Sequence, residues 1–124
     1  MRLYCAGPMS ANSFGIEFTP RGWDYNYPAF AAMSDQLDAA GYLVESPAAG
    51  DDVPGWGWVD YMRRGIAQLI LCDGVATLPG WERSRGARVE IELARGLGLP
   101  VRPGAKWLKV AVLGSGDECS SLLG

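Results

Sequence analysis

The chain has 124 residues, of which 48% are apolar, and a formal net charge of -3 from 11 basic and 14 acidic side chains. This length suits one domain over residues 1–124. The sequence shows no signal peptide and no apolar run near the ~20 residues of a membrane span, so we expect a cytoplasmic protein with no membrane partner. No basic tract is present, which argues against a nucleic-acid partner, because neutralising phosphates needs clustered Lys and Arg.

The sequence contains no histidine. This excludes Ser-His-Asp and Cys-His nucleophile systems and any His-based zinc site. Cys5, Cys72 and Cys119 are far apart with no CxxC pair, which favours buried reduced thiols over a disulfide or metal site, so no metal is expected. Acid–base or covalent chemistry would have to use carboxylates, Tyr, Lys or Cys, and a carboxylate-only enzyme points towards glycosyl chemistry.

The first half of the chain is predicted to form a strand, a long loop, a helix and a second strand. Residues 2–6 are a short apolar strand that ends at a Gly-Pro pair. The loop of residues 9–27 carries five aromatic side chains, which form either a lid or pocket wall, or a segment folded onto the core. Apolar residues at helical spacing predict a helix over residues 28–40, and residues 42–46 are a second strand.

The second half begins with a Gly/Pro/Asp/Trp-rich loop at residues 48–58, followed by a helical apolar stripe over residues 59–70. Residues 74–78 are a buried strand, after which a Pro-Gly-Trp turn and a polar loop lead into a helix that contains Glu90. Two further strands are predicted at residues 100–101 and 109–113.

Alternating strands and helices argue for a parallel sheet with helices on both faces. We therefore expect an α/β fold: a three-layer flavodoxin-like or Rossmann-like domain with a mostly parallel sheet of four to five strands. The long loops all follow strands, so they meet at one sheet edge, where such folds place ligands. Tyr4, Ser84 and Glu90 can then share one pocket.

Glu90 gives the strongest functional signal, because it lies about one turn into a helix that directly follows a glycine-bearing loop. The loop amides and the helix N-terminus suit an anionic group such as phosphate. Trp81, after the strand, either stacks on a base or packs, and Asp73 is either a site carboxylate or a turn former. No GxGxxG or GxxxxGK[ST] motif is present, which argues against NAD(P) oxidoreductases and P-loop NTPases.

Three motifs, in this order, resemble the nucleoside 2-deoxyribosyltransferase superfamily: YCAGP at residues 4–8, the Cys-Asp that ends a helix at residues 72–73, and S-x-G-x-x-x-E-x-x-x-A at residues 84–94. The closer likeness is to its 2'-deoxynucleoside 5'-phosphate N-hydrolase branch. NYPAF, GYLVESPA, YMRR, CDGVATLPGW and LGLPV are also similar to a small bacterial and phage sister family. The likeness spans residues 2 to about 101 and implies a nucleotide partner, no cofactor, and a homo-oligomer that is a dimer or larger.

The resemblance also implies a role for each site residue. Glu90 would attack the anomeric carbon, Tyr4 would orient this carboxylate or the sugar, and Ser84 would grip the 5'-phosphate. Asp73 completes the catalytic set as a candidate acid. The remaining substrate-binding residues are Gly7, Pro8, Met9, Trp81 and Gly86. A C-terminal segment is loosely similar to one that reaches a neighbouring subunit's phosphate pocket, and it comprises Ser115, Gly116 and Ser120.

One position departs from the family. Eight residues before Asp73, where the family has an aspartate that contacts the sugar or assists the leaving base, this chain has Gly65. Loss of such an acid typically slows catalysis about 10²–10⁴-fold, although Asp60 or Asp73 could substitute. Two functions therefore stay open: an N-glycosidase or deoxyribosyltransferase that acts on a (deoxy)nucleoside 5'-monophosphate, and a catalytically impaired nucleotide-binding protein. A structural domain without a ligand is a third alternative.

Overall fold

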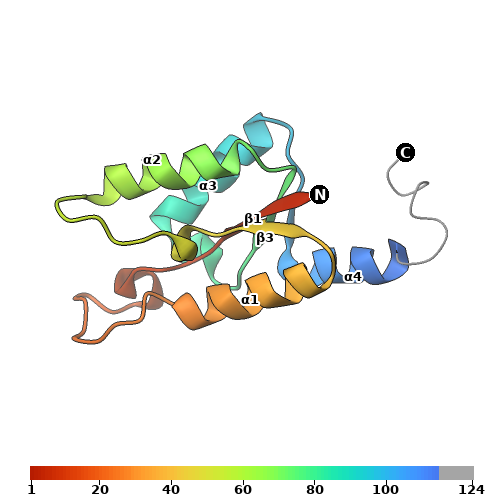
Figure 1. The fold of residues 1–124 in the computed structure, drawn as a ribbon. Coiled ribbons are helices and arrows are strands. Elements are labelled where there is room, and N and C mark those ends of the chain that lie inside the picture. Colours follow the sequence, from red (N-terminus) through yellow and green to blue (C-terminus); the bar gives the residue numbers. More distant parts are fainter. Residues whose placement is uncertain (115–124) are drawn as a thin grey trace.

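The computed structural model of the protein describes residues 1–114 (Figure 1). Within these residues the strands are β1 (Arg2–Ala6), β2 (Leu43–Glu45), β3 (Gly74–Thr77) and β4 (Val101–Pro103). The helices are α1 (Tyr27–Ala39), α2 (Trp58–Leu69), α3 (Arg85–Gly96) and α4 (Gly104–Gly114). The strands form a parallel sheet in the order β2-β1-β3-β4, which confirms the predicted α/β fold.

The helices cover both faces of this sheet, α1 and α4 on one face and α2 and α3 on the other (Figure 1). Successive residues of β1 point to opposite faces, as the pleat of a strand requires. Leu3 and Cys5 pack with Phe30 of α1, whereas Tyr4 packs with Ile91 of α3. Because β1 is buried on both faces, its apolar run is continuous rather than alternating.

The predicted strand at residues 109–113 is wrong, because these residues belong to α4. Trp107 fixes this helix on the sheet: it is 2% exposed, and its indole N–H donates to the main-chain oxygen of Val75 at 2.8 Å. Leu108 and Ala111 pack on the same core at helical spacing. The β-branched residues of the segment favour a strand locally, but tertiary packing overrides that preference.

The long loop of residues 9–27 is tied back to the end of β1. The indole N–H of Trp23 donates to the Met9 oxygen at 2.9 Å, and Asn26 Nδ2 donates to the Pro8 oxygen at 3.0 Å. Cys5 and Cys72 are buried and free, as predicted, whereas Cys119 lies outside the described residues. None of the helices within residues 1–114 is long and apolar enough to span a bilayer.

Candidate functional site

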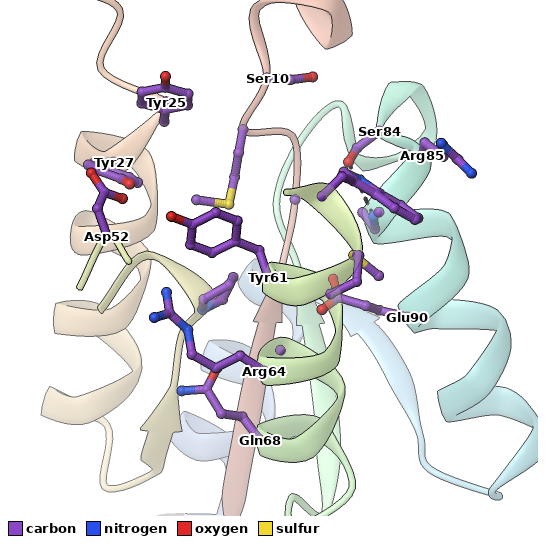
Figure 2. A pocket seen from close by; sticks show the side chains of 18 of the residues that line it. Ser10, Tyr25, Tyr27, Asp52, Tyr61, Arg64, Gln68, Ser84, Arg85 and Glu90 are labelled. Atoms are coloured by element: carbon purple, nitrogen blue, oxygen red, sulfur yellow. Dashed lines mark hydrogen bonds between the residues drawn. The ribbon is translucent and has the colours of Figure 1, made fainter. Parts of the chain in front are cut away.

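A cavity of about 580 Å³ opens at the carboxyl edge of the sheet, where the loops that follow β1, β2 and β3 meet (Figure 2). The loop after β1 contributes Gly7 and Met9, and the loop after β2 contributes Asp52. One face of α2 and the first turns of α3 complete the wall. The predicted meeting of the long loops at one sheet edge is therefore observed.

Glu90 lies in the wall of this pocket and is hydrogen-bonded by Tyr4 of β1, whose hydroxyl donates to Oε2. Tyr4 is fully buried and Glu90 is 6% exposed. Burial raises the pKa of Glu90 to about 7, and the hydrogen bond from Tyr4 opposes this rise. Burial and the Glu90 charge also hold the pKa of Tyr4 well above its ordinary value, so Tyr4 remains the donor.

The backbone of α2 rests directly on this pair at Gly65. A Cβ atom built at position 65 would lie 2.8 Å from Tyr4 Oη and 2.9 Å from Glu90 Oε2, closer than non-bonded contacts allow. Glycine therefore lets α2 approach the tyrosine–glutamate pair. The carboxylate of Asp60, the possible substitute for a missing acid, instead accepts from the Gly57 N–H at 2.9 Å as part of the helix cap.

Ser84 directly precedes α3 and lines the pocket together with Gly86. Its Oγ accepts from the Ala87 N–H at 3.1 Å, which is an N-cap that satisfies one of the orphan donors of the first turn. Ser84 is 8% exposed. Along α3, the six residues from Ser84 to Glu90 correspond to about 9 Å. The positive end of the helix dipole and the Glu90 carboxylate therefore lie at the wall of the same cavity.

Two arginines line the cavity, and both are stacked on aromatic rings. The Arg85 guanidinium lies 4.0 Å from the ring centroid of Trp58. Arg64 lies 5.3 Å from the ring of Tyr61, and its Nη1 donates to the Asp51 oxygen at 2.6 Å. These two cations in the lining make the cavity suitable for an anionic ligand.

Several lining residues were not predicted from the sequence, among them Asp52, Tyr61, Arg64, Gln68 and Arg85. Figure 2 shows Tyr27 and Asp52 on the wall opposite Ser84 and Glu90. The aromatic loop of residues 9–27 was predicted to form either a lid or pocket wall, or a segment folded onto the core. Tyr25 and Tyr27 of this loop do line the pocket wall. Polar residues on a helix ordinarily face solvent, so the polar face of α2 gave no signal.

Four predicted site residues do not line the pocket, and Tyr4 is one of them: it is fully buried and reaches the cavity only through its hydrogen bond to Glu90. Asp73 precedes β3, at the opposite edge of the sheet, where its Oδ2 accepts from the Arg2 N–H at 2.7 Å. Trp81 packs against the core and borders a separate groove outside α3, with the Arg95 guanidinium 5.9 Å from its ring centroid. Pro8 is fully buried.

The described residues bring no three Cys, Asp or Glu side chains together as a metal ion would need. Ser115, Gly116 and Ser120, with their predicted contact to a neighbouring subunit, lie outside these residues.

The fold and the pocket define an α/β domain that holds a buried tyrosine–glutamate pair at the carboxyl edge of a parallel sheet. Residues 1–102 match the family described as "Domain of unknown function (DUF4406)", and the chain belongs to this family. The match includes α2, α3 and the loops that line the pocket. No curated protein matches the chain.

Proposed function

We propose that this protein is a nucleotide N-glycosidase or 2-deoxyribosyltransferase-like enzyme that cleaves the N-glycosidic bond of a (deoxy)nucleoside 5'-monophosphate. The observation that carries this proposal is the geometry of Glu90: it is 6% exposed, faces a cavity, accepts from Tyr4, and lies on the helix whose N-terminus bounds the same cavity. The likeness of YCAGP and S-x-G-x-x-x-E to the nucleoside 2-deoxyribosyltransferase superfamily supports the same chemistry.

Glu90 suits the role of nucleophile because Tyr4 engages one carboxylate oxygen, Oε2, and leaves the other for attack. In the first step a Glu90 oxygen bonds to C1' while the C1'–N bond breaks. The electron pair of the C1'–N bond leaves with the base, which takes a proton from solvent. Water, or a second base, then attacks C1' and releases the Glu90 carboxylate. Two displacements at one carbon retain its configuration.

Ser84 and the start of α3 suit the phosphate. A pentose can place its anomeric carbon at Glu90 and its 5'-phosphate at Ser84, whose hydroxyl remains able to donate while its oxygen caps the helix. Arg85 adds a cation at the same end of the cavity. Trp58 and Tyr61 each carry an arginine on one ring face, and a base can stack on the opposite face.

The alternative is a nucleotide-binding protein that performs no chemistry, and Gly65 favours it. The position that would carry an acid has no room for one while Tyr4 and Glu90 keep their places. The other carboxylate that lines the cavity, Asp52, is exposed and belongs to the wall across from Glu90 (Figure 2). Protonation of the leaving base therefore depends on solvent.

The test is to incubate the protein with ribo- and deoxyribonucleoside 5'-monophosphates and to measure free base by chromatography. We expect release by the wild type and none by Glu90→Gln, whereas Glu92→Gln, at an exposed position on the same helix, keeps wild-type turnover. Turnover by Glu90→Gln at the wild-type rate would remove Glu90 from the reaction. A nucleotide that raises the melting temperature without giving product would identify the binder instead.

A further inference from the structure

One buried polar atom in the pocket has no partner. The side-chain oxygen of Gln68, Oε1, is shielded from solvent and accepts no hydrogen bond from any described residue, and Gln68 lines the cavity. No other side-chain nitrogen or oxygen atom within residues 1–114 is buried in this way without a partner. Buried acceptors in native proteins are almost always paired, and because Gln68 is half-buried and lines the cavity, rotation of its amide can present this atom to a donor that binds there.

The neighbours of Gln68 on α2 supply no donor. The guanidinium of Arg64, four residues earlier, is stacked on Trp56 and Tyr61 and donates to the Asp51 oxygen. Gly65 has no side chain. Cys72 donates to the main-chain oxygen of Gln68 at 3.4 Å, which leaves the amide oxygen of its side chain untouched.

Gln68 also lies on the same face of α2 as the residues that approach Glu90. Figure 2 shows Tyr61, Arg64 and Gln68 in succession along one side of the helix. Gly65, three residues before Gln68, is the point at which α2 touches the Tyr4–Glu90 pair. Residues three apart are neighbours on a helix surface, so Gln68 lies next to the place where a sugar must sit if Glu90 attacks its anomeric carbon.

We propose that Gln68 is a specificity residue whose Oε1 accepts a hydrogen bond from a sugar hydroxyl of the nucleotide, an inference that rests on the proposed function. A carbonyl-type oxygen repels phosphate, so this part of the cavity takes a neutral donor rather than the anionic end of the ligand. Pentose hydroxyls are such donors next to the anomeric carbon. Gln68 thereby contributes on α2 a sugar contact that Gly65 cannot make.

The experiment compares dissociation constants for 5'-monophosphates with ribose, 2'-deoxyribose or 2',3'-dideoxyribose and the same base. It is performed in the Glu90→Gln background, so that the ligand is not consumed. With Gln68 present, we expect removal of both hydroxyls to weaken binding about tenfold, the effect of one neutral hydrogen bond. With Gln68→Leu, the three affinities become equal within about twofold, whereas Gln68→Glu keeps an acceptor and keeps the discrimination.

The matched control is Gln36→Leu, at the exposed glutamine of α1, which should keep the tenfold discrimination. Gln68→Leu should melt no lower than its parent, because the change removes an unpaired polar atom. The sugar contact would be overturned if Gln68→Leu keeps the tenfold preference for the ribose ligand. It would also be overturned if Gln68→Leu weakens binding of the dideoxy ligand as much as binding of the ribose ligand. If the parent protein itself binds none of the three nucleotides, the proposed function fails as well, and this result is recognised before any Gln68 variant is made.

Discussion

Substitution of Gly65 by alanine tests the close approach between α2 and the Tyr4–Glu90 pair. The added Cβ would lie 2.8 Å from Tyr4 Oη and 2.9 Å from Glu90 Oε2, so these atoms must move by roughly half an ångström to reach ordinary contact. The Glu90 side chain can rotate, but the fully buried ring of Tyr4 lies on a central strand and cannot shift cheaply. Overpacking of this kind costs about 1–3 kcal/mol.

The helix itself gains from the substitution, because alanine is about 1 kcal/mol more favourable than glycine inside a helix. Gly96→Ala is the control without overpacking, since Gly96 is the exposed last residue of α3 and nothing lies within 4 Å of an added Cβ. We therefore expect the unfolding free energy of Gly65→Ala to lie about 1–3 kcal/mol below that of Gly96→Ala in urea titrations followed by tryptophan fluorescence.

Base release should fall with the same change, by about 10–100-fold, because the carboxylate no longer holds its position relative to the sugar. Gly65→Asp, which would supply the carboxylate expected from the family likeness, meets the same steric obstacle and should not raise base release. If Gly65→Ala is as stable as Gly96→Ala and turns over like the wild type, the tight contact between α2 and the pair is refuted.

Two further predictions concern the protonation of Glu90 and the phosphate site. The folded protein holds Glu90 protonated to about pH 7, whereas the unfolded chain releases this proton near pH 4.5, so wild-type stability should fall across this range by up to roughly 3 kcal/mol relative to Glu90→Gln. Base release should rise over the same pH range, because the nucleophile ionises. If the stability difference between wild type and Glu90→Gln does not change with pH, Glu90 is not a buried carboxyl with a raised pKa. Ser84→Asp keeps an acceptor for the Ala87 N–H, so its unfolding free energy should stay within about 0.5 kcal/mol of wild type, whereas Ser84→Ala should lose about 1 kcal/mol. Calorimetric titration should show Ser84→Asp binding nucleoside monophosphates at least about tenfold more weakly while unphosphorylated nucleosides bind as before, and equal phosphate affinity would remove Ser84 from that site.

The strands of the sheet and three of the helices could be predicted because each depends on a local sequence pattern, and the edge at which the pocket lies follows from the parallel topology. The apolar run of β1 and the helical spacing before Gly41 are visible in the sequence, and parallel strands bring the loops together by topology alone. The prediction for residues 109–113 failed because a run of four apolar residues after Lys109 suits either a strand or a helix. Trp107, whose hydrogen bond to β3 fixes the helix on the sheet, acts through a tertiary contact that the sequence does not reveal.

The site was predictable only where a residue lies in the loop after a strand or in the first two turns of the helix that follows that loop. Ser84 and Glu90 satisfy that condition and line the pocket, whereas Asp73 was placed with them although it lies before its strand. The contributions of Arg64 and Gln68 depend on how α2 is rotated about its axis, which the polar residues of its sequence do not reveal. The unpaired oxygen of Gln68 is a property of packing and has no sequence signature.

The most direct test of Glu90 as the nucleophile is peptide mass spectrometry on protein quenched with acid during turnover of a deoxynucleoside 5'-monophosphate. The proposed mechanism predicts a mass increase of one deoxyribose phosphate, less water, on the peptide that contains Glu90, and no such adduct in Glu90→Gln. Base release by the wild type with the adduct on a different residue, or with equal release by Glu90→Gln, would contradict it.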